Sequence, residues 1–371
     1  MIVGGAQESV MLTADLLDKE KFDVTLITGI ETGPEGGLIS ESKNRGIKLR
    51  LLPELVRNIS PVKDSIALWK LYKLMKIEKF DIVHTQTAKA RFIGTIAAKM
   101  AGIPIVLQSV HGWSFNNQID GKRTFYIILE KIITLLTNKN ILVSTMDKEN
   151  GIALGIGHPN KYVIIRPGID INNFEKVKSN ARENRKQVDI PEDVPLIGIV
   201  GRLSRPKTPD VFLRAARIVV DRYPSAEFLI VGDGHLRGSL EELCKQLGLS
   251  SKVHFLGLRR DVPELLSALD ILVHSSLWEA LGKVIIEGKI MEKPIVATNV
   301  GGVLDIIEDQ VSGLLVNPNN HQELARAIMQ LLKDKKMAKM LAETHSQELH
   351  EFSVQKMIAD TSTLYFSLFN G

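Results

Sequence analysis

The stretch Asp270-Ile-Leu-Val-His-Ser-Ser-Leu-Trp-Glu-Ala-Leu-Gly-Lys-Val-Ile-Ile-Glu287 predicts an apolar strand, a short loop and the start of a helix. Glu279 lies on the loop, and Glu287 lies eight positions later in the second turn of the helix. Gly282 opens this helix, whose first N–H groups have no backbone partner and attract an anion such as phosphate. The stretch is compatible with a ligand that has hydroxyls and phosphate, although Glu287 taken alone fits a solvated helix face better.

The rest of the chain alternates short β-branched runs with helical segments, which is typical of parallel sheets covered by helices on both faces. At 371 residues and 44% hydrophobic, the chain is long enough for two such domains. We therefore expect an α/β fold with two doubly wound domains, whose ligands bind outside the carboxyl ends of the strands, where the domains face each other across a cleft. Twelve strands are expected, at 23–28, 47–52, 81–85, 104–110, 141–144, 162–166, 196–200, 226–231, 253–256, 271–274, 295–297 and 314–316.

A polar stretch from Val177 to Asp193 has no apolar period and is the predicted linker, at 177–193. It would separate an N-terminal domain at 1–176 from a C-terminal domain at 194–350. The tail 351–371 is too apolar for a free end, so we expect a C-terminal helix that packs back on the N-terminal domain. Its apolar residues include Phe352, Leu364, Tyr365, Phe366 and Phe369.

The start of the chain is short for such a fold. Only Met1-Ile2-Val3 precede Gly4-Gly5, whereas a central strand usually has about five or six residues. The sequence thus predicts a shortened first strand, and a protein less stable and less active than a version extended upstream.

Composition restricts the partners and the compartment. Lys and Arg exceed Asp and Glu by 47 to 43, which suits an acidic substrate or an anionic membrane but does not require nucleic acid. The single cysteine, Cys244, excludes an intramolecular disulfide, and no apolar stretch approaches the roughly 18 residues of a membrane span. We expect a cytoplasmic protein. The segment Ile66 to Lys76, which contains Trp69 and several lysines, could make a peripheral contact with the inner membrane face. Packing in the core explains the apolar residues of that segment equally well.

Two strand ends carry further polar residues. Arg202 and Lys207 follow the strand 196–200 in a glycine-started loop, where two cations would hold a diphosphate. His111 ends the strand 104–110 and starts His111-Gly112-Trp113, which fits either a structural histidine or a binding loop with Trp113 as the wall for a sugar ring. There is no Asp-x-Asp, His-x-x-x-His or Cys-His cluster, so neither a metal nor a cofactor is expected.

Taken in order, these motifs resemble retaining GT-B glycosyltransferases of family 4 over nearly the whole chain. The residues that carry the resemblance are Gly4-Gly5, His111-Gly112-Trp113, Arg166-Pro-Gly-Ile-Asp170, Gly201-Arg202-Leu203 with Lys207, Val231-Gly-Asp-Gly234, Phe255-Leu-Gly257, Glu279-x7-Glu287 and Val300-Gly-Gly302.

The resemblance implies transfer of a sugar, with retention of configuration, from a nucleotide-diphosphate donor to a polysaccharide or glycolipid acceptor. Arg202 and Lys207 would hold the diphosphate, Glu287 the ribose hydroxyls and Glu279 the donor sugar, with His111 near the transferred sugar. The expected catalytic residues are thus His111, Arg202, Lys207 and Glu279. The donor site would be completed by Gly4, Gly5, Gly234, Leu256, Gly257, Leu281, Gly282, Lys283 and Glu287.

The chain also departs from the family pattern. In Glu287-Gly-Lys-Ile-Met-Glu-Lys-Pro294, Gly288 and Lys289 replace apolar helix residues and Glu292 replaces a helix-ending glycine. Thr208 and Ala280 likewise replace glycines near the donor. Two alternatives therefore stay open, a nucleotide-sugar epimerase of the same architecture and an inactive nucleotide-sugar binder.

Overall fold

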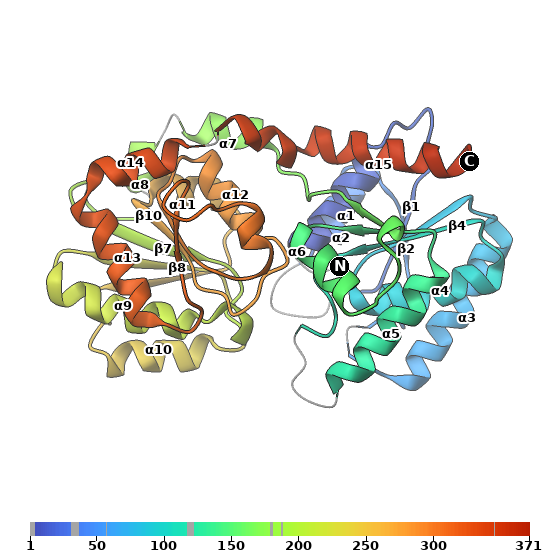
Figure 1. Ribbon diagram of the computed structural model, residues 1–371, viewed down its shortest axis with the longest axis horizontal. Coiled ribbons are helices and arrows are strands. Elements are labelled where there is room, and N and C mark those ends of the chain that lie inside the picture. The colour runs from blue at the N-terminus through green and yellow to red at the C-terminus, as the bar shows by residue number, and fades with distance from the viewer. Residues whose placement is uncertain are drawn as a thin grey trace. The chain divides into compact units, whose positions relative to one another are not determined.

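A computed structural model describes residues 4–371 apart from 31–36, 57, 117–121, 179–180, 187 and 345. The chain forms two compact units. Unit 1 comprises Met1–Gly168 with Ser353–Gly371, and unit 2 comprises Ile169–Phe352 (Figure 1). Residues 1–3, on which the expected shortened first strand falls, lie outside the described residues.

The described strands of unit 1 form two parallel sheets. The larger sheet has the order β3-β4-β5-β6, and its strand β4 is buried along its whole length. The strands are β1 (Thr25–Thr28) and β2 (Lys48–Leu51) in the smaller sheet, with β3 (Ile82–Thr85), β4 (Ile105–Val110), β5 (Lys139–Leu142) and β6 (Tyr162–Ile164) in the larger. The helices are α1 (Gly5–Leu16), α2 (Ile39–Asn44), α3 (Pro61–Glu78), α4 (Ala88–Ala101), α5 (Lys122–Leu136), α6 (Thr145–Ala153) and α15 (Val354–Phe369).

Unit 2 contains a six-stranded parallel sheet in the order β12-β11-β10-β7-β8-β9. The strands are β7 (Leu196–Val200), β8 (Glu227–Val231), β9 (Val253–Gly257), β10 (Ile271–His274), β11 (Ile295–Thr298) and β12 (Leu314–Val316). The helices are α7 (Ile171–Lys178), α8 (Ala181–Lys186), α9 (Pro209–Arg222), α10 (Arg237–Gln246), α11 (Val262–Ala268), α12 (Lys283–Ile290), α13 (His321–Lys333) and α14 (Lys335–Glu343).

The order of the unit 2 strands reverses between β7 and β10. From β7 the chain builds outward through β8 to β9, then returns and builds outward on the other side from β10. The loops that follow β7 and β10 therefore diverge. Open α/β sheets bind ligands in the space between such loops, at the carboxyl ends of the two strands. The apolar runs in these strands form the core, in which Phe212 and Phe228 meet edge to face and are fully buried.

All twelve strands predicted from the sequence are present, with ends that differ by at most two residues. Strand β5 is displaced by two residues at both ends, since it spans Lys139–Leu142 rather than 141–144. Ser144 instead caps α6, because its side chain accepts the N–H of Asp147 at 3.2 Å.

The division between the units lies at Gly168 and Ile169, not at the linker predicted for 177–193. That stretch contains α8, where Asn184 and Arg185 are buried against unit 2. Arg185 donates to the carbonyl of Ala268 at 2.8 Å and to the carboxylate of Asp270 at 3.0 Å. The local polarity of this stretch indicated a linker. Its polar side chains instead bind partners that are far away in the sequence, which a local pattern does not show.

The C-terminal helix α15 belongs to unit 1, as its apolar residues indicated. Val354 and Met357 pack with Ile141 and Ile165, and Figure 1 shows α15 beside α1. Tyr365 contributes a polar anchor, since its hydroxyl lies 2.6 Å from Nδ1 of His84 on β3.

Candidate functional site

The loops at the carboxyl edge of the unit 2 sheet are joined to one another by backbone hydrogen bonds. The loop after β7 reaches the loop after β8 through Leu203 N–H and Asp233 O, 3.0 Å apart, and reaches the loop after β10 through Leu277 N–H and Pro206 O, 2.8 Å apart. The Gly232 N–H donates to Gly257 O at 2.8 Å, and the Gly302 N–H donates to Glu279 O at 3.1 Å. The edge is thus one connected backbone surface around the β7 and β10 reversal.

Two glycines of the family pattern are required by this close approach. A Cβ on Gly234 would lie 2.3 Å from the Leu203 carbonyl oxygen, and one on Gly302 would lie 1.9 Å from the Ala280 carbonyl oxygen. Backbone atoms cannot give way as a flexible side chain can, so only glycine fits at either position.

Lys207 and Glu279 form an ion pair that joins the loops after β7 and β10. The Lys207 side chain is 34% exposed and the Glu279 side chain 15%. Burial raises the pKa of Glu279, but the Lys207 charge and the hydrogen bond from His274 outweigh it and hold that pKa well below its usual range. Glu279 is therefore ionised, and the structure brings together two of the four predicted catalytic residues.

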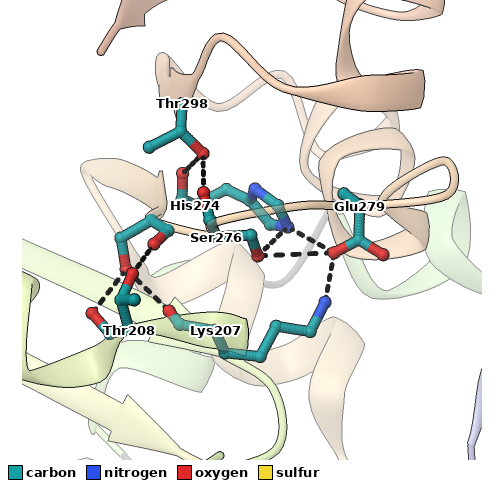
Figure 2. A network of polar contacts seen from close by, with 7 residues as sticks. Lys207, Thr208, His274, Ser276, Glu279 and Thr298 are labelled. Carbon is teal, nitrogen blue, oxygen red and sulfur yellow. Dashed lines mark hydrogen bonds and ion pairs between the residues drawn. The ribbon is translucent and has the colours of Figure 1, made fainter. Parts of the chain in front are cut away.

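His274, a residue not singled out from the sequence, completes this cluster. It is the last residue of β10, and its Nε2 lies 3.0 Å from Oε2 of Glu279 (Figure 2). Ser276 places its hydroxyl 3.4 Å from the same carboxylate oxygen. The signal in the sequence is a histidine that ends an apolar strand five residues before the first glutamate of the motif.

Thr208 occupies a position with glycine-like backbone geometry. Its φ is +40°, and its side-chain hydroxyl donates to the Ser275 carbonyl (Figure 2). The Ser275 hydroxyl in turn donates to the carbonyls of Lys207 at 3.1 Å and Thr208 at 3.2 Å. Such bonds offset the cost of a left-handed β-branched residue and hold Lys207 against the β10 loop.

The predicted donor-site residues Arg202, Leu256 and Gly257 lie on the same edge. Arg202 follows Gly201 in the loop after β7 and is partly buried, while Leu256 and Gly257 end β9. Gly257 has a φ of +67°, and its Cβ position faces Arg237, which pairs with Asp233 at 3.2 Å.

Helix α12 begins as the sequence predicted, with Gly282 as its N-cap at a φ of +92° after the buried Leu281. Lys283 is its first residue, and its Nζ lies 3.6 Å from the Glu287 carboxylate one turn later. The Glu287 side chain is only 12% exposed, so the alternative of a solvated helix face does not apply.

The unusual residues after Glu287 have structural reasons. A Cβ on Gly288 would lie 2.3 Å from Cδ2 of Leu272 on β10, so the bare backbone lets α12 pack close to the sheet. Lys289 is buried and donates from Nζ to the Ile306 carbonyl at 3.0 Å. Glu292 ends the segment with a φ of +48°, the conformation of the glycine it replaces.

The other predicted site residues lie in unit 1. Gly4 and Gly5 start α1, and His111 follows β4 with Nε2 2.9 Å from Oε1 of Gln86. Burial, with a smaller effect of the Arg91 charge, lowers the pKa of His111 to about 4, so the ring is neutral near pH 7. The expected role of Trp113 as a sugar wall is wrong, because its ring is 1% exposed and donates to the Asp147 carbonyl at 2.7 Å.

No group of three or more His, Cys, Asp or Glu side chains able to hold a metal ion occurs within the described ranges. The polar atoms that gather at the unit 2 edge are cations, carboxylates and hydroxyls, a set suited to binding phosphate and sugar hydroxyls.

Comparison with known proteins places the chain in a family. The model described as Glycosyltransferase Family 4 matches residues 3–173, and that of Glycosyl transferases group 1 matches residues 180–347. A UDP-Gal:alpha-D-GlcNAc-diphosphoundecaprenol alpha-1,3-galactosyltransferase of Escherichia coli is 30% identical over 371 residues, covering 99% of this chain and 95% of the relative. The capsular polysaccharide biosynthesis glycosyltransferase CapM of Staphylococcus aureus is 25% identical, covering 86% of this chain and 87% of the relative.

Solved structures agree on the fold. Anabaena HepE in complex with UDP-glucose superposes with a TM-score of 0.82 at 23% identity, covering 98% of this chain and 96% of that one. WaaG, a glycosyltransferase involved in lipopolysaccharide biosynthesis, gives 0.76 at 19% identity, with 96% of each chain covered. The chain therefore belongs to the family 4, group 1 glycosyltransferases and has their GT-B fold of two Rossmann-like domains.

Proposed function

We propose that the chain transfers a hexose, with retention of its anomeric configuration, from a UDP-sugar to a saccharide on a lipid diphosphate. The observation that carries the proposal is the Lys207 and Glu279 pair at the reversal of the unit 2 sheet, where a cation for diphosphate and a carboxylate for hydroxyls lie side by side. The name of the Escherichia coli relative supports UDP-galactose as donor and a GlcNAc-diphospholipid as acceptor.

In this mechanism Lys207 and Arg202 neutralise the donor diphosphate, and Glu287 accepts the ribose hydroxyls. The bond from the sugar C1 to the diphosphate breaks, and the acceptor hydroxyl forms a new bond to C1 on the face that the diphosphate leaves. A phosphate oxygen takes the acceptor's proton, so UDP is released and configuration is retained. The main catalytic contribution of the protein is then to stabilise the negative charge on the leaving diphosphate.

His111 would act as a neutral hydrogen-bonding group near the transferred sugar, because a ring with its pKa lowered to about 4 holds no charge near pH 7. Gly4 and Gly5 would let the start of α1 approach the donor closely, since glycine has no side chain to exclude it.

A product assay tests the proposal. The protein is incubated with UDP-galactose, UDP-glucose or a GDP-hexose, each with and without a synthetic GlcNAc-diphospholipid, and products are followed by mass spectrometry and NMR. We expect a disaccharide lipid with the anomeric configuration of the donor. A new sugar nucleotide without acceptor would instead support the epimerase, and nucleotide binding without turnover would support the inactive binder.

We also propose a peripheral contact with an anionic membrane, where such an acceptor would reside. The contact would be made by helices α3, α4 and α5, of which α4 packs against both others, and their exposed side is called here the α3–α5 surface. Its exposed apolar residues are Val62, Ile66, Trp69, Ile77, Ile96, Met100, Phe125, Ile128, Ile132 and Leu135. On α5 these residues recur at intervals of three and four, so they share one helix face.

Charge supports the same partner. Helices α3, α4 and α5 carry ten Lys and Arg but three Asp and Glu, and one acid, Glu130, is buried in a pair with Arg91. Exposed apolar residues with basic neighbours suit a bilayer of anionic lipids. In the described part of the chain, no helix is both long and apolar enough to cross a bilayer. The predicted contact thus extends from the segment Ile66 to Lys76 onto α5.

A further inference from the structure

Three hydrogen-bond donors meet one oxygen of Glu279. Oε2 receives the ammonium of Lys207, Nε2 of His274 at 3.0 Å and the hydroxyl of Ser276 at 3.4 Å (Figure 2). Within the described residues, Oε1 accepts no hydrogen bond, and the side chain is 15% exposed. The carboxylate is thus held by one oxygen and offers the other.

The chemistry of this contact assigns the proton on His274. Burial lowers the pKa of the ring, which is therefore neutral and carries one N–H. An ionised carboxylate only accepts hydrogen bonds, so Nε2 must be the protonated nitrogen. Nδ1 is buried and has no partner among the described residues, and a second proton there would leave an unpaired buried donor.

The three donors differ in their freedom to move. The Lys207 side chain is 34% exposed on a loop, whereas His274 is 4% exposed at the end of a buried strand. A donor diphosphate attracts Lys207 more strongly than a single carboxylate does, because it carries more charge. When the ammonium turns to the diphosphate, Glu279 keeps only the donors from His274 and Ser276.

We propose that His274 is a positioning residue of the donor site. It holds Glu279 through Oε2 when Lys207 transfers to the diphosphate, so that Oε1 stays directed at a hydroxyl of the transferred sugar. This inference rests on the proposed function. It predicts that His274 affects binding of the transferred sugar but not binding of the nucleotide.

Calorimetry with UDP and with UDP-galactose separates these two effects. His274→Leu removes the donor at similar volume, and His274→Gln places an amide N–H near the position of Nε2. In the Leu variant we expect the Kd for UDP to change less than about twofold. The sugar-dependent gain, which is the affinity for UDP-galactose relative to that for UDP, should fall about tenfold or more, and so should kcat. Tenfold is the scale of one charge-assisted hydrogen bond. The Gln variant should recover most of both losses.

His254 supplies a matched control, because it is a histidine on strand β9 of unit 2 that also hydrogen-bonds a carboxylate, that of Glu227. His254→Leu should leave the ratio of the two Kd values unchanged. The inference is overturned if His274→Leu keeps the full sugar-dependent gain, or if its affinities for UDP and UDP-galactose fall together.

Nitrogen-15 NMR of the imidazole rings gives a readout that needs no turnover. The His274 signals, assigned by their loss in His274→Gln, should show the Nε2–H tautomer and keep it on saturation with UDP-galactose. An Nδ1–H tautomer or a charged ring would overturn the inference, even if the Leu variant fails to fold. Failure of the wild type to bind any nucleotide would instead reject the proposed function. The tautomer measured by NMR would then still show whether Nε2 of His274 donates a hydrogen bond to Glu279.

Discussion

The ammonium of Lys207 and the carboxylate of Glu279, 72 positions apart in the sequence, are ion-paired across the two loops where the unit 2 strand order reverses. A diphosphate that binds Lys207 therefore binds an ammonium that already contacts Glu279. Because lysine has three N–H donors, the ammonium can contact both anions or exchange one for the other. In either case, we expect the affinity for the nucleotide to depend on both side chains.

Lys207→Ala should reduce turnover by about 10²-fold or more, because it removes a cation that stabilises the leaving diphosphate. Affinity for UDP should fall as well, as measured by calorimetry. The exposed Lys245 on α10 is the control, and Lys245→Ala should leave both quantities unchanged. A folded Lys207→Ala protein with wild-type kinetics would show that the cation has no such role.

Glu287→Gln should weaken binding of UDP, since a neutral amide is a poorer acceptor for ribose hydroxyls than a carboxylate. The affinity for inorganic diphosphate, which has no ribose, should change much less. Calorimetry with both ligands measures the difference, and equal losses for the two would point to a general disturbance of α12.

Gly288→Ala should destabilise the protein by about 1–3 kcal/mol, the usual cost of overpacking a core. Helix propensity alone would predict a gain of about 0.5–1 kcal/mol, so the two effects have opposite signs. The contact responsible is Cδ2 of Leu272, 2.3 Å from the added Cβ. Thermal unfolding should therefore show that adding Leu272→Ala makes Gly288→Ala less harmful, and strict additivity of the two changes would refute this cause.

Stability should fall as the pH drops below about 6.5, partly through His84 and His111. Burial lowers their pKa values to about 3 and about 4, so between those values and 6.5 the unfolded chain binds protons that the folded chain does not. The free energy of unfolding then rises with pH in this range. Replacing His111 with Asn should reduce the difference in urea midpoint between pH 5 and pH 7.5. If the difference is unaltered, groups other than His111 cause the pH dependence of stability.

Binding to vesicles tests the α3–α5 surface. Wild-type protein should float with vesicles rich in anionic lipid at low salt, and less so at high salt because salt screens the basic residues. The double change Ile128→Glu with Leu135→Glu should abolish flotation. Leu258 and Met340 are exposed apolar residues of unit 2, so their replacement by Glu is the matched control.

The strands and the start of α12 were predictable because they depend on local patterns. Apolar β-branched runs identify buried parallel strands, and Gly282 after a polar loop indicates a helix start. The contact of Glu279 with Lys207 and His274 was not predictable, since it depends on β7 and β10 being neighbours and on how the β10 loop folds back. Trp113 and the stretch around Arg185 were misjudged for the same reason, because their partners Asp147 and Asp270 lie 34 and 85 positions away.

The backbone hydrogen bonds that join the loops of the unit 2 edge do not depend on the identity of most side chains there. Leu203 N–H with Asp233 O and Leu277 N–H with Pro206 O would persist through many substitutions at these positions. The edge can therefore be redesigned for another sugar or base by exchanging exposed side chains, with little loss of shape. Engineering of donor choice should succeed sooner on these loops than in the strands beneath them.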